Sequence, residues 1–227
     1  MSIAIHGSPS VTTPSGGSNI ITANCPTSSA GDVRVAILSL NDNSLQTWTI
    51  PSGWTQRVNY HHNAAVFDSF QLSVFTYVCA GGDPATALFT ASGGEVNQAI
   101  IIAYSGVDNT TPWDTQSTND GGNAAPTGLT ISTAVANELV LWLSNNDGQL
   151  TSVPAGFTTR VDGSTNAGET GTFVGVYDKI FASSGATGAL VGATSGNNDW
   201  IVVVGALKPA AGAAPPPALF FGAGTTS

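Results

Sequence analysis

An octapeptide that occurs twice constrains the fold of this chain more than any other feature. The stretch "PSGWTQRV" at Pro51–Val58 returns as "PAGFTTRV" at Pro154–Val161, with Phe157 in place of Trp54. Proline fixes φ and the glycine after it tolerates positive φ, so each copy begins with a turn. The aromatic and β-branched residues that follow favour a strand. The sequence therefore predicts one turn-and-strand unit used twice, with its aromatic residue facing a core.

The repetition continues beyond the octapeptide. An alignment matches "SVFTYVCAGGDPATALFTASGG" (Ser73–Gly94) with "GVYDKIFASSGATGALVGATSG" (Gly175–Gly196), "QAIIIAYSG" with "WIVVVGALK", and "DVRVAILSLND" with "ELVLWLSNND". These runs are rich in Val, Ile, Thr, Phe and Tyr, and no window has a sustained 3.6-residue apolar period. We predict an all-β chain with near-zero helix, in which residues 1–208 form a β-sandwich that contains repeats at about 19–106 and 129–208.

The packing of the two halves can follow one of two plans. The runs "QAIIIAY" and "WIVVVGAL" are continuously apolar, which predicts strands covered on both faces or at the centre of a sandwich. The halves could form two separate sandwiches or share one. Halves this small would be marginal alone, so we favour one antiparallel sandwich of jelly-roll type with pseudo-two-fold related halves. The polar connection at Gly106–Gly128 has the composition of a linker.

Charge and composition restrict the classes of partner. Charged residues make up 8% of the chain, against roughly 25% in an average soluble domain. Such a surface is common in extracellular and virion-surface β proteins. The net charge is −9 and the cations are scattered singly, so we expect no nucleic-acid partner.

Nothing in the sequence points to a membrane or to export. The run at Ala99–Tyr104 is too short to span a bilayer, and no basic amphipathic segment indicates an anionic membrane. The opening "MSIAIHGSPS" lacks the basic and apolar regions of a secretory signal, so we expect synthesis in a cytoplasm. In that compartment Cys25 and Cys79 are expected to be free thiols, with a disulfide as the alternative. The alignment supports free thiols because Cys79 matches Phe181, an apolar position.

Few residues carry recognisable chemistry, and we expect no enzyme, no cofactor and no metal site. No nucleophile elbow, P-loop, zinc-protease or dinucleotide pattern is present. The pair His61–His62 is predicted to lie in a solvated hairpin-like loop, since further zinc ligands are missing nearby. A glycosidase needs two carboxylates across a cleft, and Glu138 has no obvious partner in the sequence.

Loops rich in Asn and Asp leave one alternative open. The clusters "NDN" at Asn41–Asn43 and "NND" at Asn145–Asp147 recur at matching places, and Asp108, Asp114 and Asp120 fall in the long connection. Such residues close turns by bonding their own backbone. They could also supply oxygen ligands to Ca²⁺, but none of the loops has the spacing of a known calcium loop.

Tryptophans raise the possibility of sugar binding, because aromatic faces stack on pyranose rings. Trp54 is assigned to the core by its Phe157 counterpart, and Trp142 and Trp200 fall in strands. Trp48 and Trp113 remain in loops and are the tentative ligand-binding residues. A shared exposed groove would support this role, and burial would remove it.

The last segment, Pro209–Ser227, is a Pro/Ala/Gly-rich arm that cannot fold alone. Its prolines favour an extended polyproline conformation, and its apolar cluster could fill a partner groove or add to a neighbouring sheet edge. The alternative is that the arm folds back over its own sandwich. The predicted partner-binding residues are Pro215, Pro216, Pro217, Leu219, Phe220 and Phe221.

Three stretches carry a resemblance to known proteins: "PSGWTQRV", "AYSGVDNTTPWD" and "PAGFTTRV". Their G-aromatic-T-x-R strand start and A-Y-x-G-V-D…T-P-x-D strand exit resemble a loose group of Thr/Ser/Gly-rich β-sandwich proteins. These occur in tailed-phage virions, as decoration or fibre proteins, and among bacterial surface proteins. The resemblance covers about Ile20–Lys208 and implies a particle-exterior or adhesive role, with no catalytic residue to carry over.

The resulting expectation is a phage virion structural protein, either a capsid decoration or cement protein or a small fibre-type subunit. Its partners would be other virion proteins or copies of itself in a homo-oligomer, and its location the virion surface. The alternative is a carbohydrate-binding adhesin or module, on a phage tail or secreted, with a host-surface glycan as ligand.

Overall fold

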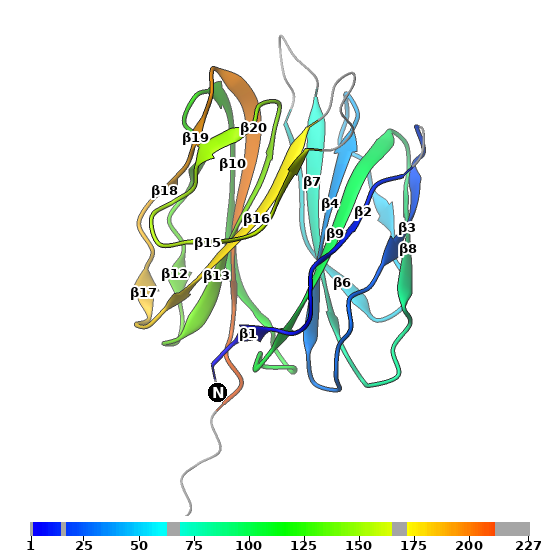
Figure 1. Ribbon diagram of the computed structural model, residues 1–227, viewed down its shortest axis with the longest axis vertical. Helices are drawn as coiled ribbons and strands as arrows, with labels where there is room; N and C mark the ends of the chain where they lie inside the picture. The colour runs from blue at the N-terminus through cyan, green and yellow to red at the C-terminus, as the bar shows by residue number, and fades with distance from the viewer. Residues whose placement is uncertain (1, 15–16, 63–68, 165–171, 212–227) are drawn as a thin grey trace, which may run out of the picture.

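The computed structural model describes residues 2–14, 17–62, 69–164 and 172–211, and every regular element in them is a β-strand (Figure 1). None of these residues forms a helix long and apolar enough to cross a membrane. The first half of the chain supplies β1 (Ala4–Ile5), β2 (Ser10–Thr12), β3 (Ile20–Asn24), β4 (Val33–Asn41), β5 (Trp48–Thr49), β6 (Trp54–His62), β7 (Phe70–Val78), β8 (Thr86–Ala91) and β9 (Glu95–Ser105).

The second half contains corresponding strands, but its outer strands are shorter and more numerous. It contributes β10 (Trp113–Asn123), β11 (Thr127–Gly128), β12 (Ser132–Thr133), β13 (Glu138–Asn146), β14 (Leu150–Ser152), β15 (Thr158–Ser164), β16 (Phe173–Phe181), β17 (Gly185–Ala186), β18 (Leu190–Val191), β19 (Ala193–Thr194) and β20 (Asn198–Leu207).

Two large antiparallel sheets form the centre of the molecule. The first large sheet has the order β1-β9-β4-β7-β6, with β2 also pairing with β9, and the second has the order β10-β20-β13-β16-β15. Outside the first lies the small sheet β3-β8-β5, and outside the second lie the pairs β11-β18, β12-β17 and β14-β19. The halves therefore use corresponding strand orders, with β20, β13, β16 and β15 in the places of β9, β4, β7 and β6.

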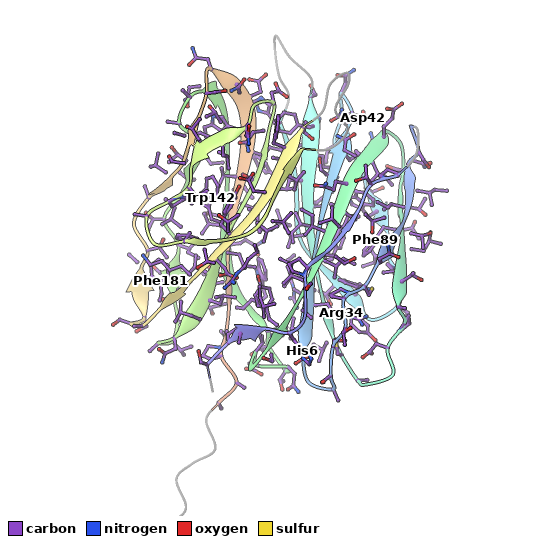
Figure 2. All side chains as sticks on the ribbon, in the orientation of Figure 1. His6, Arg34, Asp42, Phe89, Trp142 and Phe181 are labelled. Carbon is purple, nitrogen blue, oxygen red and sulfur yellow. The ribbon has the colours of Figure 1, made fainter. Side chains whose placement is uncertain are left out.

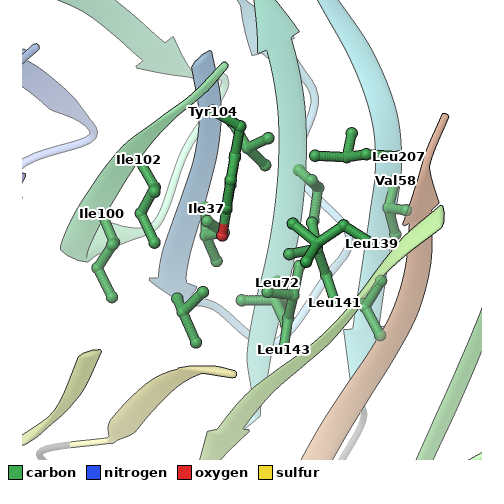
Figure 3. Close-up of a cluster of buried hydrophobic side chains, with 14 of the residues drawn as sticks. Ile37, Val58, Leu72, Ile100, Ile102, Tyr104, Leu139, Leu141, Leu143 and Leu207 are labelled. Atoms are coloured by element: carbon green, nitrogen blue, oxygen red, sulfur yellow. The ribbon is translucent and has the colours of Figure 1, made fainter. Parts of the chain in front are cut away.

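The sheets stack as four layers that enclose three hydrophobic cores (Figure 1). The interlayer core lies between the two large sheets and includes Ile37, Leu72 and Leu141 (Figure 3). Two outer cores lie beneath the outer layers, one around Phe89 and one around Trp142 (Figure 2). The all-β, antiparallel, sandwich-like prediction is confirmed. Four layers are present instead of one shared pair of sheets, because the apolar strands of both large sheets have two faces to cover.

The strand register corrects one part of the sequence alignment. Val33 pairs with Tyr104 in the first large sheet, and Leu139 pairs with Leu207 in the second. Tyr104 thus corresponds to Leu207 in the structure, whereas the sequence alignment matches Tyr104 with Ala206. Tyr104 and Leu207 both face the interlayer core, and Ala206 faces an outer core. A shift of one residue moves every side chain of a strand to the opposite face, which letter matching does not detect.

The two halves pack like the protomers of a symmetric dimer. Ser39 on β4 corresponds to Asn145 on β13, and the Asn145 amide nitrogen donates to Ser39 Oγ at 2.9 Å. Contact between a residue and its own counterpart is what a two-fold axis produces. At one edge, Gln116 on β10 donates to the carbonyl of Arg57 on β6. At the opposite edge, β1 and Arg160 on β15 line one cavity of about 170 Å³. The two halves therefore meet through the interlayer core and at both of its edges.

The repeated octapeptide forms the same turn in both halves. In each copy the proline carbonyl accepts a hydrogen bond from the amide of the aromatic residue, at 3.3 Å for Trp54 and 3.1 Å for Phe157. The intervening glycines have positive φ, 83° at Gly53 and 78° at Gly156, where a side chain would be strained. Both aromatic side chains are buried, each in the outer core of its own half.

The arginine of each octapeptide occupies a β-bulge. The ladder skips Arg57 in β6 and Arg160 in β15, and an extra residue at a bulge redirects its side chain. Arg57 Nε donates to Thr76 Oγ1 at 2.8 Å, whereas Arg160 makes two 2.8 Å contacts to the carboxylate of Asp178. Tyr104 of the first half donates to the same carboxylate at 3.1 Å. Arg160 and Asp178 therefore help to join the halves.

The composition of the polar connection between the repeats suggested a linker, but this segment is part of a sheet. It contains β10, an edge strand of the second large sheet that pairs along β20. An edge strand tolerates polar residues because only one side of its backbone is paired. Ser117 and Asn119 use their side chains to bond the carbonyls of Leu129 and Thr127. The polar residues of this segment are therefore explained by hydrogen bonds within the second half.

We predict that Arg160→Met destabilises the protein by about 3 kcal/mol, because it leaves the buried Asp178 carboxylate without its cation. The matched variant Arg57→Met removes a bond to the neutral Thr76 hydroxyl and should cost about 1 kcal/mol. Urea unfolding of both variants tests this. Equal losses would contradict a role for the Asp178 charge.

Candidate functional site at the chain-exit end

Both ends of the described chain leave the body at the same end, which we call the chain-exit end. Strand β1 pairs with the last residues of β9, and Ala210 donates its amide to the carbonyl of Gly106 at 2.8 Å. A groove of about 400 Å³ lies beside this exit. We call it the exit groove; it is lined by Asp108, Val135, Ala136, Asn137, Lys208, Pro209, Ala210 and Ala211.

A buried acid pair lies next to the exit groove. Glu138 opens β13, is fully buried, and accepts the amide of Val135 on Oε1 at 2.9 Å. Its side chain also shares a hydrogen bond with Asp114, at the start of β10. Asp114 accepts the amide of Ala134 on Oδ2 at 2.9 Å and contacts Lys208 Nζ with Oδ1 at 3.0 Å. Three titratable side chains thus meet where β10, β13 and β20 converge.

The hydrogen bond between the two acids requires a proton on one of them, and that proton belongs to Glu138. Burial, together with the negative charge of Asp114, raises the pKa of Glu138. Burial acts in the same direction on Asp114, but the hydrogen bonds from Lys208 and Ala134 overcome it and lower the pKa of Asp114. The same contact raises the pKa of Lys208. When the two acids share one proton, these opposite directions place it on Glu138, and the Asp114 carboxylate faces the Lys208 amine.

The first half carries a related pair at the corresponding place. Asp32 precedes β4 as Glu138 opens β13, and its carboxylate lies 2.6 Å from Nδ1 of His6. The β1 and β10 registers make His6 the counterpart of Asp114. The first half thus pairs its buried acid, Asp32, with a histidine. The second half pairs its buried acid, Glu138, with a second acid.

Sequence reasoning missed the Glu138 partner, because Asp114 lies in the segment interpreted as a linker. The only available signal was the correspondence of "DVR" with "ELV", which places an acid at the start of the same strand in both halves. The partner could be found only after β10 was recognised as a strand.

A second polar cluster lies at the edge of the interlayer core where β6 meets β10 and β20. Tyr60 donates to Asp120 at 2.5 Å, and His62 contacts Asp120 at 2.6 Å and Asp199 at 3.5 Å. The hydrogen bond to Asp120 raises the pKa of Tyr60 to about 12. The prediction that His61–His62 is a solvated loop pair is wrong. Both residues belong to β6, whose alternation buries His62 at the interlayer side.

The structure does not bring Trp48 and Trp113 together. Trp48 packs against the first outer core, and its indole nitrogen donates to Ser73 Oγ at 2.9 Å. Trp113 packs against the interlayer core on the other side of the first large sheet, and donates to Gln116. Each is half-buried, and the two do not line one surface.

The Asn- and Asp-rich loops close turns in the described residues. Asp42 accepts the amide of Ser44 at 2.9 Å, and Asp108 accepts the amide of Thr110 at 2.9 Å. Within residues 2–14, 17–62, 69–164 and 172–211, no group of three or more His, Cys, Asp or Glu side chains is arranged to hold a metal ion.

The predicted arm residues Pro215, Pro216, Pro217, Leu219, Phe220 and Phe221 lie outside the described residues, which end at Ala211. Arm positions Pro209 to Ala211 are described, and they line the exit groove.

No protein-family model, no curated protein and no solved structure matches this chain.

We predict that the difference in unfolding free energy between Glu138→Gln and the wild type shifts towards the variant as the pH rises from about 4.5, the ordinary pKa of a glutamate, whatever its size below that pH. A folded-state pKa above the unfolded value means that the folded protein binds more protons in this window, so wild-type stability falls through it. Glutamine does not titrate and carries no such loss. Urea unfolding across a pH series measures the difference.

Glu95→Gln is the control for this series, because Glu95 is solvent-exposed. A difference curve for Glu138→Gln that is flat with pH would contradict the raised pKa of Glu138.

Cys25 and Cys79 are both free thiols, and burial raises the pKa of each. We predict that neither reacts quickly with a thiol reagent in the folded protein, since the thiolate is the reactive form. Both should react after denaturation without a reductant. A denatured, unreduced sample that has no titratable thiol would overturn this assignment.

Proposed function

We propose that this chain is a structural subunit of a particle exterior, of the kind found on tailed-phage virions: a capsid decoration or cement protein, or a small fibre-type subunit. The supporting observation is that both ends of the described chain leave beside one groove at one end of the body. Such a body can be attached at the chain-exit end and present its opposite end to the outside. The proposal includes no catalytic activity and no cofactor.

A rigid body suits this role. The two large sheets share the interlayer core, and buried polar contacts join the halves at both edges. Asp178 binds Arg160 of its own half and Tyr104 of the other. At the other edge, His62 of the first half contacts Asp120 of the second. Relative movement of the halves would break the bond from Tyr104 to Asp178 and the contact of His62 with Asp120, and would leave these polar groups without partners.

The surface chemistry also favours an extracellular or virion setting. The outer face of β3 and β8 exposes Thr22 and Thr86 beside the aliphatic residues Ile20 and Leu88. A protein surface with few charges and many hydroxyl groups gives little attraction to nucleic acid or to anionic membranes.

We propose that residues 212–227 attach the body to its partners, which are other virion proteins or further copies of this chain in a homo-oligomer. The apolar cluster in the sequence of this segment, and the place beside the exit groove where the segment begins, support this role. Burial of each large apolar side chain of the arm contributes about 1.5–3 kcal/mol, which suffices for attachment when repeated around a symmetric assembly.

We predict that truncation after Ala211 abolishes self-association but leaves the unfolding temperature unchanged, because the cut spares the bond from Ala210 to Gly106. Analytical ultracentrifugation and thermal unfolding measure the two properties. A matched full-length control replaces Leu219, Phe220 and Phe221 with serine and should behave like the truncation.

The opposite result would reject the attachment role of the arm. If the truncated chain loses thermal stability as a monomer but still associates, the segment acts on its own body instead.

The alternative function is a carbohydrate-binding adhesin or module with a host-surface glycan as ligand. The separation of Trp48 and Trp113 on two sides of the first large sheet gives it less support. Glycan binding that is lost in Trp48→Ala or Trp113→Ala, and retained after truncation at Ala211, would favour it over the structural role.

A further inference from the structure

We propose that Lys208 and Asp114 form an intramolecular isopeptide bond, an amide between Lys208 Nζ and Asp114 Cγ, with Glu138 as the residue that transfers protons. This inference does not rest on the proposed function. It assigns a self-modification site to the buried acid pair beside the exit groove.

The reacting groups are already in contact and are held from several sides. Lys208 Nζ lies 3.0 Å from Asp114 Oδ1. The Lys208 backbone donates its amide to the carbonyl of Pro112 at 3.0 Å and accepts the amide of Asp108 at 2.9 Å. The Asp114 side chain is 9% exposed and shares a hydrogen bond with Glu138. These contacts fix the Lys208 backbone; its side chain is 27% exposed at the edge of the exit groove, and its amine reaches inward to the Asp114 carboxyl group.

The two carboxyl oxygens of Asp114 have different neighbours, and each has its own role in the proposed reaction. Oδ2 accepts the amide of Ala134 at 2.9 Å, so an N–H group is in place to stabilise negative charge on this oxygen when the amine adds to Cγ. Oδ1 faces Lys208 and is the oxygen that departs. Glu138 shares a hydrogen bond with the Asp114 carboxyl group and is the acid placed to deliver a proton during the reaction.

The step balances without any further reactant. An ammonium group and a carboxylate become an amide and one water molecule. The Nζ–Cγ bond forms, the Cγ–Oδ1 bond breaks, and two protons from Nζ end on the departing oxygen. Glu138 gives one proton and recovers one, so it finishes as it began. The first proton must leave the ammonium before attack, and the carboxylate that receives it is the salt-bridge partner itself.

Proximity and burial favour the product. Held reactants behave as if present at effective molarities of about 10⁵–10⁸ M, which offsets the tendency of water to hydrolyse an amide. Amide formation also removes the charge of the Asp114 side chain, which is 9% exposed, and with it the cost of keeping that charge away from water. The fully buried Glu138 then has a neutral neighbour.

The other ion pairs of the described chain cannot react in this way. Asp178 is paired with Arg160, and a guanidinium is not a nucleophile at neutral pH. In the first half the counterpart of Lys208 is Ser105, so the Asp32–His6 pair has no amine beside it. The combination of an amine, a carboxyl group and a second, buried acid occurs at the second-half site alone among the described residues.

The bond would have a mechanical consequence. It would join the start of β10 to the chain just after β20, immediately before the segment that leaves the body. Force applied through the C-terminal segment would then pass into the second large sheet through a covalent bond at Lys208, and could not peel β20 from its neighbours.

Mass spectrometry of the denatured wild-type protein tests the proposal directly. We expect an intact mass lower than the sequence mass by one water molecule. Trypsin should release the fragment Val58–Arg160, which contains Asp114, joined to the fragment Ile180–Ser227, which contains Lys208. An intact mass equal to the sequence mass, with the two fragments separate, would overturn the proposal.

Variants assign the roles. Lys208→Arg keeps the positive charge but not the nucleophile, and should have its full mass and a lower unfolding temperature than the wild type. Glu138→Gln should also have its full mass while remaining folded by circular dichroism, and a water loss that persists in it would reject the part assigned to Glu138. The first-half control Asp32→Asn should still lose water.

Discussion

The structure depends on the interlayer core, the apolar contact between the two large sheets. Strands such as β9 send Ile100 to one side of their sheet and Ile101 to the other, and both side chains are completely buried. A sheet of this kind must be covered on both faces, because apolar surface is driven out of water wherever it lies. The outer layer of each half covers one face only. The halves therefore cover each other.

Polar groups gather where this core ends. At one edge Asp178 meets Arg160 and Tyr104, and at the other Asp120 meets Tyr60 and His62. Burial of these groups is costly, and the cost is offset only when each finds its partner in the other half or on the next strand. Such contacts favour one alignment of the sheets over neighbouring ones. The hydrogen bond between Glu138 and Asp114 differs from these contacts, because two carboxyl groups share a hydrogen bond only when one of them carries a proton. A proton is therefore held at the chain-exit end, beside the amine of Lys208 and the carboxyl group of Asp114.

The structural role and the proposed amide concern the same end of the molecule. A subunit held by one end transmits force through the strands nearest its exit, which are β10 and β20 in this chain. A covalent joint between those strands is useful at that place and would add little elsewhere. The two proposals remain separate, because a covalent bond at Lys208 is compatible with either an attached subunit or an adhesin.

The sequence by itself determined the all-β class, the two turns at Pro51 and Pro154 and the burial of Trp54 and Phe157. Local rules suffice for these features, since φ at proline and glycine and the alternation of apolar residues act over a few positions. The tertiary structure alone decided the four layers, the strand β10, the one-residue shift of β20, the burial of His62 and the meeting of Glu138 with Asp114. Each of these depends on contacts between residues far apart in the chain, where the choice of neighbour decides which face is buried and which charge is paired.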